Sequence, residues 1–296
     1  MHKVYKILDK FFSNFLKIIC ILTILLLSLI IFIIGKESLL LFKEYSFWDF
    51  VTGTKWTPLS KTPSFGILPM ILSTLYTSAI ALIIALPIGI GTALYTSCML
   101  SKKAHKYTLP LFNLLAGIPS VVYGFFGFLV LVKLFEDKLN FSSGESILIG
   151  GIILSIMILP YIISTCHESM TKIYDSYIDV SKSFGVSKWY MIKELILPSS
   201  KLAIFTSASL GLSRAIGETM AVMMVIGNSP IIPKLLSRGE TLSGLIALEM
   251  GASEIGSLHY HALYGAGFVL ILILLILNII FLFIKNKLEK NIYRGD

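Results

Sequence analysis

The stretch DVSKSFGVSKWYMIKELILP, residues 179–198, is a polar segment with several lysines between two long apolar runs. Its first turns are amphipathic, and Gly185 then permits the backbone turn that ends a helix and reverses the chain. Pro198 fits the first turn of a following helix, where the missing N–H costs little. The pattern therefore predicts a rigid helical knob that projects from a bundle of apolar helices. An ordinary basic loop between two helices is the simpler alternative.

The composition places the chain in a bilayer. Of 296 residues, 55% are hydrophobic and 14% are charged, and the mean hydropathy is +0.84. This balance excludes a soluble globular domain. The apolar runs are continuous rather than alternating, so we predict an all-α polytopic bundle and not a closed β-barrel. The net charge of +8 needs no nucleic-acid partner, because basic side chains at the membrane surface account for it.

Six apolar runs are long enough to cross a bilayer about 30 Å thick. The first is predicted to be an uncleaved helix, because the polar segment 35–38 follows it instead of a cleavage site of small residues. Residues 36–65 are expected to form an interfacial loop with a short helix. In the second run, Gly89 and Gly91 indicate a kink or a close helix approach. The fourth run is expected to end near Pro160. The predicted spans are 18–34, 66–100, 109–132, 147–163, 202–226 and 263–284.

The distribution of Lys and Arg predicts the orientation. Six spans put both termini on one side, and the loops and tails of that side carry sixteen Lys and Arg residues against eight on the other. The positive-inside rule places the richer side, which includes the knob, in the cytoplasm. We therefore divide the chain into an N-terminal helix with an extracytoplasmic loop, residues 1–65, and a core domain, residues 66–296.

The third apolar run contains the segment AGIPSVVYGFFG, residues 116–127. Such a density of Gly and Pro is costly in an isolated helix. We therefore predict close packing on protein, with Ser120 or a neighbour satisfying the backbone groups that Pro119 frees. The alternative is a pore-lining break near Gly117, where small side chains leave room for a polar solute.

Two charged residues, Arg214 and Glu218, lie inside the fifth apolar run. A charge near the bilayer centre costs about 2.5 to 3.5 kcal/mol on insertion scales, so both are expected to face protein or water. Their i to i+4 spacing predicts that they share one helix face. Small or polar residues continue that stripe: Ser207, Gly211, Ala221 and Val225.

The charged pair suggests a transit site for an anion. The planar guanidinium of Arg suits bidentate contact with an oxyanion such as phosphate, which would take Arg214 from Glu218 and then release it. A salt bridge that fixes this helix to a neighbour is the structural alternative. The candidate pathway residues are Arg214, Glu218, Ser213, Ser207, Gly117, Pro119 and Ser120.

Two resemblances to a known family add to these predictions. The 179–198 stretch is similar to the EAA loop of ABC importer permeases, a cytoplasmic helix that docks into a cleft of an ATPase subunit. The matching residues are Asp179, Val180, Ser181, Gly185, Leu195, Leu197 and Pro198. The segments 65–69, 117–124 and 213–220 resemble those of phosphate-specific ABC importer permeases of the PstC type. The family's intramembrane Arg and Glu correspond to Arg214 and Glu218.

The resemblance implies a transport subunit, not an enzyme, that moves inorganic phosphate across a bacterial cell membrane. It also implies a sister permease as heterodimer partner, two copies of an ATPase subunit and an external phosphate-binding protein. ATP and Mg are expected on the ATPase, because this chain lacks the G-x-x-x-x-G-K-[ST] motif, and we expect no cofactor or metal here. The alternatives are a permease for another oxyanion such as molybdate or sulfate, an intramembrane lipid-phosphate enzyme, or a membrane scaffold.

Overall fold

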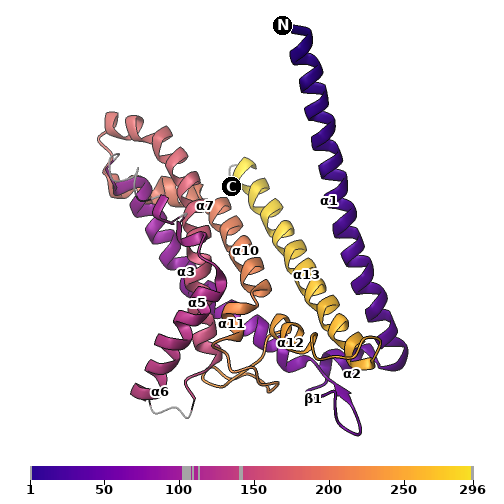
Figure 1. The fold of residues 1–296 in the computed structure, drawn as a ribbon. Coiled ribbons are helices and arrows are strands. Elements are labelled where there is room, and N and C mark those ends of the chain that lie inside the picture. Colours follow the sequence, from indigo (N-terminus) through magenta and orange to yellow (C-terminus); the bar gives the residue numbers. More distant parts are fainter. Residues whose placement is uncertain (1, 102–107, 109, 113, 140–142, 295–296) are drawn as a thin grey trace.

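Helices make up most of the computed structural model, which describes residues 2–101, 108, 110–112, 114–139 and 143–294 (Figure 1). Within these residues, four helices are long and apolar enough to cross a membrane, and the number rises to six if each of two bent helix pairs is one span. The predicted all-α bundle is therefore confirmed. The loop predicted at 102–106 lies outside the described residues.

Four long helices form the frame of the molecule: α1 (His2–Glu44), α3 (Leu68–Leu94), α7 (Ile147–Ser183) and α13 (Leu258–Arg294). The shorter helices are α2 (Phe47–Thr52), α5 (Ser120–Phe126), α6 (Lys133–Leu139), α8 (Lys188–Met191), α9 (Leu197–Ser199), α10 (Lys201–Gly217), α11 (Met220–Met223) and α12 (Leu242–Glu249). Three π-helical segments are η1 (Tyr95–Met99), η2 (Gly127–Val132) and η3 (Ile192–Ile196). Strands β1 (Trp56–Thr57) and β2 (Ser64–Phe65) form an antiparallel hairpin in which Trp56 pairs with Phe65.

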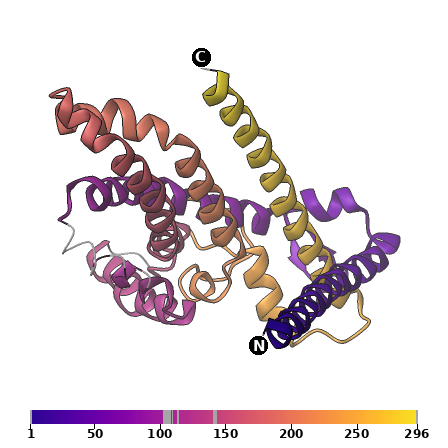
Figure 2. The same cartoon turned by 90° about the horizontal axis from the view of Figure 1, so that it is seen from above.

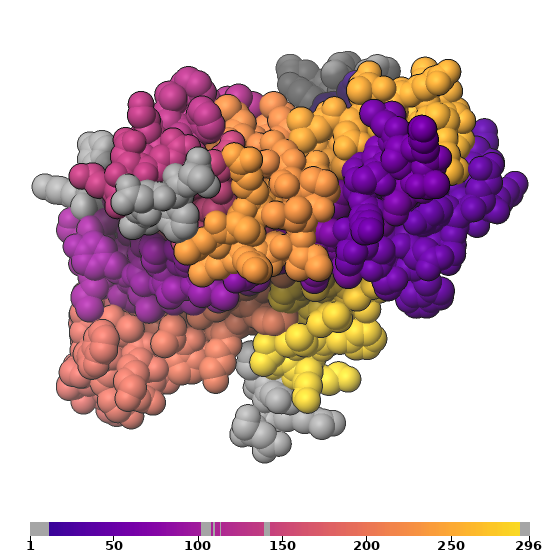
Figure 3. Space-filling view, turned by 90° about the horizontal axis from the view of Figure 1, so that it is seen from below, coloured from indigo at the N-terminus to yellow at the C-terminus, as the bar shows by residue number. Residues whose placement is uncertain are grey.

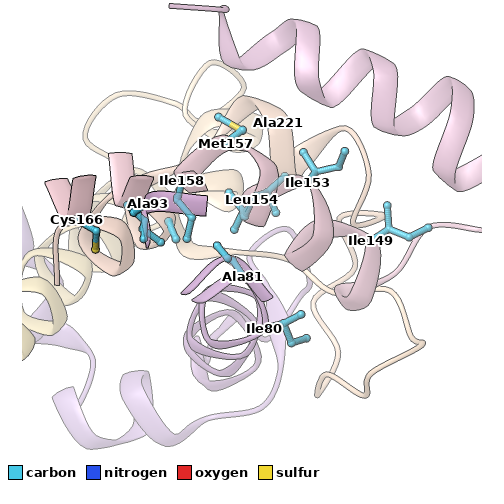
Figure 4. Close-up of a cluster of buried hydrophobic side chains, with 14 of the residues drawn as sticks. Ile80, Ala81, Ala93, Ile149, Ile153, Leu154, Met157, Ile158, Cys166 and Ala221 are labelled. Carbon is cyan, nitrogen blue, oxygen red and sulfur yellow. The ribbon is translucent and has the colours of Figure 1, made fainter. Parts of the chain in front are cut away.

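The main core lies between α3 and α7, and Figure 4 shows side chains from both helices gathered in it. A Cβ added at Gly89 of α3 would lie 2.6 Å from Ile162 Cγ2, and one added at Gly151 of α7 would lie 2.5 Å from Ile80 Cγ2. Lipid tails are as apolar as Leu, so membrane helices associate through close packing at small residues. The close approach predicted at Gly89 is confirmed.

Helix α7 is longer than predicted. It does not end near Pro160 but continues through this buried proline to Ser183. Pro160 removes one backbone hydrogen bond, a loss that membrane helices tolerate where neighbouring helices pack around them. The motif that begins at Asp179 is therefore the end of a membrane helix and not a separate short helix. One continuous helix joins the middle of the bundle to the knob.

Two other spans are broken. Pro110–Ala116 and Ser120–Lys138 meet at 85°, and Lys188–Ser199 and Lys201–Gly217 meet at 59°. The break after Ala116 has a local cause, because the residue before a proline is disfavoured in the α region. The prediction that the fifth span is one helix over 202–226 is wrong for its last part, because α10 ends at Gly217.

A smaller core closes the end of the molecule opposite the knob. Its buried residues come from the end of α1, from α2 and the hairpin, and from α3, α12 and α13; Leu41, Phe50, Phe65 and Leu263 are among them. The short helix predicted in the 36–65 loop is α2. On this face the hairpin segment lies beside the chain that connects α11 to α13 (Figure 3).

The apolar part of α1 stands clear of the other helices (Figure 1). None of its most apolar window is buried, whereas 67% of the corresponding window of α7 is. A helix that is apolar on all sides requires lipid or another protein around it. The frame of the bundle therefore has its protein-buried centre at α7 and its most exposed helix at α1.

Candidate functional site

Arg214 lies in the last turn of α10, about 20 Å from the start of that helix at 1.5 Å per residue. Its guanidinium carbon lies 4.4 Å from the centre of the Tyr161 ring, which belongs to α7. Among the described residues, no carboxylate lies within 4.0 Å of this guanidinium. Arg214 thus lies inside the span, rests on an aromatic face and remains exposed on its other side.

The prediction that Glu218 shares a helix face with Arg214 is wrong. Helix α10 ends at Gly217, and Glu218 has an extended backbone with φ −72° and ψ 131°. Its Oε1 accepts a hydrogen bond from Ala221 N at 3.3 Å, and its carbonyl oxygen accepts one from Ser243 Oγ at 2.8 Å. The carboxylate therefore caps the first turn of α11. This local bond competes with the helical conformation that i to i+4 pairing requires.

The predicted stripe of small residues is wrong in its second half, because Ala221 and Val225 lie beyond the end of α10 at Gly217. Its first half, Ser207 and Gly211, is a contact between α10 and α7. Ser207 is buried, and its Oγ lies 3.3 Å from Cys166 Sγ on α7. A Cβ added at Gly211 would meet Ile162 of α7 at 3.5 Å. Ser207 therefore packs between two helices, while Ser213 lies on another side of α10 and donates a hydrogen bond to Asn278 Oδ1 of α13 at 3.5 Å.

The break between Ala116 and Ser120 adjoins the Arg214 site. Tyr161 Oη donates a hydrogen bond to the Ala116 carbonyl at 3.4 Å, and Tyr123 Oη donates one to the Leu115 carbonyl at 2.8 Å. These phenols satisfy carbonyls at the end of the half-helix, a role predicted for Ser120 or a neighbour. Gly117 and Pro119 lie in the break itself and are exposed.

Tyr161 therefore connects two segments that are separate in the sequence. Its ring supports Arg214 and its hydroxyl binds the backbone beside Gly117. Tyr161 was not among the predicted site residues. The available signal was a tyrosine directly after Pro160 in an apolar run, since a buried phenol needs a hydrogen-bond partner.

The knob has the geometry that its sequence predicts at the turn. Gly185 has φ +68°, and Val186 N donates to the Ser181 carbonyl at 2.9 Å. Asp179 and Val180 are exposed on the last turns of α7, whereas Leu195, Leu197 and Pro198 are partly buried in η3 and α9. Phe184 and Trp189 project from the tip with 80% and 68% of their surface exposed. The knob is anchored at one end and presents aromatic side chains at the other.

The fold and this arrangement define the class of protein. The chain belongs to the family described as binding-protein-dependent transport system inner membrane component, whose family model matches residues 85–294. It is an ABC transporter permease, a multi-pass membrane protein, and members of this class are transport subunits rather than enzymes.

Several curated relatives are phosphate permeases. The chain is 34% identical over 245 residues to the phosphate transport system permease protein PstC of Xylella fastidiosa. This alignment covers 76% of this chain and 74% of the relative. The probable phosphate transport system permease protein PstC of Methanocaldococcus jannaschii is 31% identical over 245 residues, and the alignment covers 77% of this chain and 78% of the relative. The probable ABC transporter permease protein YqgH of Bacillus subtilis is 34% identical over 242 residues, and the alignment covers 81% of this chain and 77% of the relative. The predicted resemblance is confirmed.

A solved structure agrees in fold. The MetNI methionine ABC transporter in an inward-facing conformation aligns with a TM-score of 0.56 and 14% identity, over 75% of this chain and 95% of that chain. At this identity the likeness shows the permease fold alone.

Proposed function

We propose that this chain is the permease subunit through which an ATP-driven importer carries inorganic phosphate into the cytoplasm. The observation that carries the proposal is Arg214, a guanidinium inside a span that rests on an aromatic ring and has no carboxylate partner among the described residues. Such a group can donate two parallel hydrogen bonds to an oxyanion. Relatives named as phosphate permeases support phosphate as that anion.

A transit site has to bind weakly, and the Tyr161 contact suits that need. A cation–π contact is worth about 0.5 to 2 kcal/mol, depending on how far the pair is desolvated. An arriving anion therefore displaces little when it binds the free side of Arg214. When the anion leaves, the guanidinium still has a partner and is not stranded in low dielectric.

The same proposal assigns partners to the rest of the molecule. The knob docks on one of two ATPase subunits, which bind ATP and Mg, and a sister permease and an external phosphate-binding protein complete the importer. Both termini then lie in the cytoplasm. Helix α7 carries Tyr161 and, about 27 Å further along its axis, Asp179, so a movement of the docked knob is transmitted to the Arg214 site through one helix.

The test is phosphate uptake by the assembled importer with Arg214→Gln. Two hydrogen bonds to a charged group are together worth about 3 kcal/mol or more, so uptake is expected to fall at least about a hundredfold. Arg214→Lys keeps the charge but loses the fork and is expected to be severely impaired. The control is Arg238→Gln, because Arg238 pairs with Glu145 at 3.1 Å at the far end of the molecule.

Co-purification of the ATPase has to be unchanged in these variants for the result to concern the site. Near-normal phosphate uptake by Arg214→Gln would overturn the proposal. Normal sulfate or molybdate uptake without phosphate uptake in the unmodified importer would overturn the choice of anion.

A further inference from the structure

Helices α10 and α13 lie side by side (Figures 1 and 2), and side chains of both line a groove between them. Its volume is about 250 Å³, and its walls are mainly apolar. The rings of Phe205 and Phe281 face each other across it with their centres 5.1 Å apart, and polar groups lie on both sides of this pair. Its lining includes Thr206, Ser209 and Leu210 of α10 and Asn278 and Lys285 of α13. No part of the proposed function so far uses this groove.

The groove begins about one helical turn from Arg214. Leu210 lines the groove and lies four residues before Arg214, so the two residues are one turn apart on the exposed face of α10. Ser213, next to Arg214 in the chain, donates to Asn278 Oδ1 at 3.5 Å. From this level the groove continues past Ser209 and Thr206 toward the start of α10. It therefore extends from the Arg214 level toward the knob side.

Lys285 lies at the other end of the groove, about 10 Å along α13 from Asn278. Its Nζ lies 3.8 Å from Glu289 Oε1, and the two side chains are 42% and 39% exposed. Exposed pairs at this spacing are worth only about 0.3 to 0.5 kcal/mol, so an anion can replace Glu289 at small cost. The groove thus has a cation at its cytoplasmic end.

Polar groups on this face would be costly against lipid. Asn278 is exposed on an apolar helix, and its Nδ2 donates to Leu274 O of the same helix at 2.9 Å, its one hydrogen bond from that nitrogen within the described part of the chain. Amides and ammonium groups within membrane spans face protein or water and mark solute pathways. Water or a sister subunit has to fill this groove, and the cation at its end favours water and an anion.

We infer that the α10–α13 groove is the exit path of the transported oxyanion, with Lys285 and Asn278 as a second, cytoplasmic anion station after Arg214. This inference rests on the proposed function. The anion leaves Arg214, passes the hydroxyl groups of Ser209 and Thr206, and is attracted to Lys285 before it enters the cytoplasm. A tetrahedral oxyanion such as phosphate suits hydroxyl, amide and ammonium donors of this kind.

The test measures charge selectivity inside the groove and not uptake. Ser209→Cys is made in a chain whose three native cysteines are replaced, and the full importer is studied in inside-out membrane vesicles. A negatively charged and a positively charged methanethiosulfonate of similar size are applied, and the rate at which each modifies the cysteine is measured. This rate is divided by the rate at which the same reagent modifies a free thiol in solution. We expect a ratio of about tenfold in favour of the anionic reagent, since a charged cleft concentrates counter-ions.

Two variants locate the source of this preference. Lys285→Gln is expected to bring the ratio close to one, whereas Lys287→Gln, which removes an exposed lysine two residues further on, is expected to leave it unchanged. Inorganic phosphate at millimolar concentration is expected to slow the modification. Arg214→Gln is expected to abolish uptake but to keep the preference at Ser209→Cys.

Three outcomes would overturn the inference. The first is no reaction with either reagent in the assembled importer, which would mean that the sister subunit fills the groove. The others are equal normalised rates for the anionic and cationic reagents, or a preference for the anionic reagent that survives Lys285→Gln. Failure of the proposed function is separate from these. It would appear as phosphate uptake that persists in Arg214→Gln, whatever the labelling rates are.

Discussion

At the scale of single residues, the unexpected partner of Arg214 is an aromatic ring. The sequence pattern paired Arg214 with Glu218, which would have made a neutral and self-satisfied site. In the structure Glu218 caps α11 and Tyr161 supports the guanidinium, so the site keeps a net positive charge. A positive site that is only weakly held is better suited to receive an anion than a salt bridge, because no ion pair has to be broken first.

Substitution of Tyr161 tests this arrangement. Tyr161→Phe keeps the ring under Arg214 and loses only the hydrogen bond to Ala116 O, so phosphate uptake is expected to stay within about threefold of the original. Tyr161→Leu removes the cation–π contact, and uptake is expected to fall by about twofold to thirtyfold. Both variants should assemble with the ATPase. Equal uptake by the Phe and Leu variants would show that the ring does not support Arg214.

At the scale of elements, the knob depends on one backbone conformation. Gly185 has φ +68°, and a Cβ at this position would meet nothing within 4 Å. A substitution there would consequently act through the backbone and not through a clash. The turn directs α8 back from the end of α7 and exposes the aromatic tip.

Gly185→Val places a β-branched residue at positive φ, which costs about 1 to 3 kcal/mol locally. We expect the variant to insert in the membrane but to lose ATPase co-purification, or phosphate-dependent ATP hydrolysis if docking persists. Gly185→Asn is the matched control, since Asn tolerates the left-handed region. Retention of both properties by the Val variant would show that the turn does not shape the docking surface.

A second element, the segment before α12, contains a buried acid. Burial, with a smaller effect from Glu249, raises the pKa of Glu240 from 4.5 to about 7. Glu249 is itself held by Trp56 Nε1 at 3.0 Å and by His259 Nε2 at 2.7 Å. In an unfolded chain the Glu240 carboxyl ionises near pH 4.5, whereas in the folded protein it stays neutral until the pH approaches about 7.

The sign of the pH effect follows from the raised pKa of Glu240. A raised pKa stabilises the fold fully below about pH 4.5, and this contribution is lost as the pH rises through about 7; a shift of this size corresponds to about 3 kcal/mol at most. The melting temperature in detergent is expected to fall between pH 5 and 8. Glu240→Gln should flatten this dependence, and Glu254→Gln, an exposed control, should not. An unaltered pH profile in Glu240→Gln would contradict the assignment.

At the scale of the whole molecule, the knob and the hairpin lie at opposite ends of the bundle (Figure 1). The helical frame fixes this separation, and the Lys and Arg distribution predicts which end is cytoplasmic. The proposed exit groove opens toward the knob. Orientation in the membrane is therefore the property on which the direction of transport depends.

Labelling of single cysteines tests the orientation in a chain without its native cysteines. Positions Ser187 and Lys287 are expected to react with an impermeant maleimide only in inside-out vesicles, and Lys61 and Arg238 only in intact cells. All four positions are exposed, so an absent reaction reports sidedness and not burial. The reverse pattern would place the knob outside the cell and remove the basis for ATPase docking.

The sequence by itself determined the properties that depend on local or summed chemistry. Length and hydropathy of the runs predicted the helical bundle, the left-handed turn at Gly185 followed from residue type, and the intramembrane charge at Arg214 was visible without coordinates. The 179–198 stretch and three further motifs were enough to identify the permease family. These features are readable because each depends on residues close together in the chain or on the composition of a whole segment.

Only the tertiary structure decided how the parts meet. Whether Pro160 ends a helix depends on the helices packed around it, and the partner of Arg214 lies more than fifty residues away in the chain. The end of α10 at Gly217 likewise depends on bonds from Glu218 to α11 and to Ser243. Periodicity describes one helix at a time, whereas contacts between helices are set by packing and hydrogen bonding across the bundle, and these decide which charges remain free.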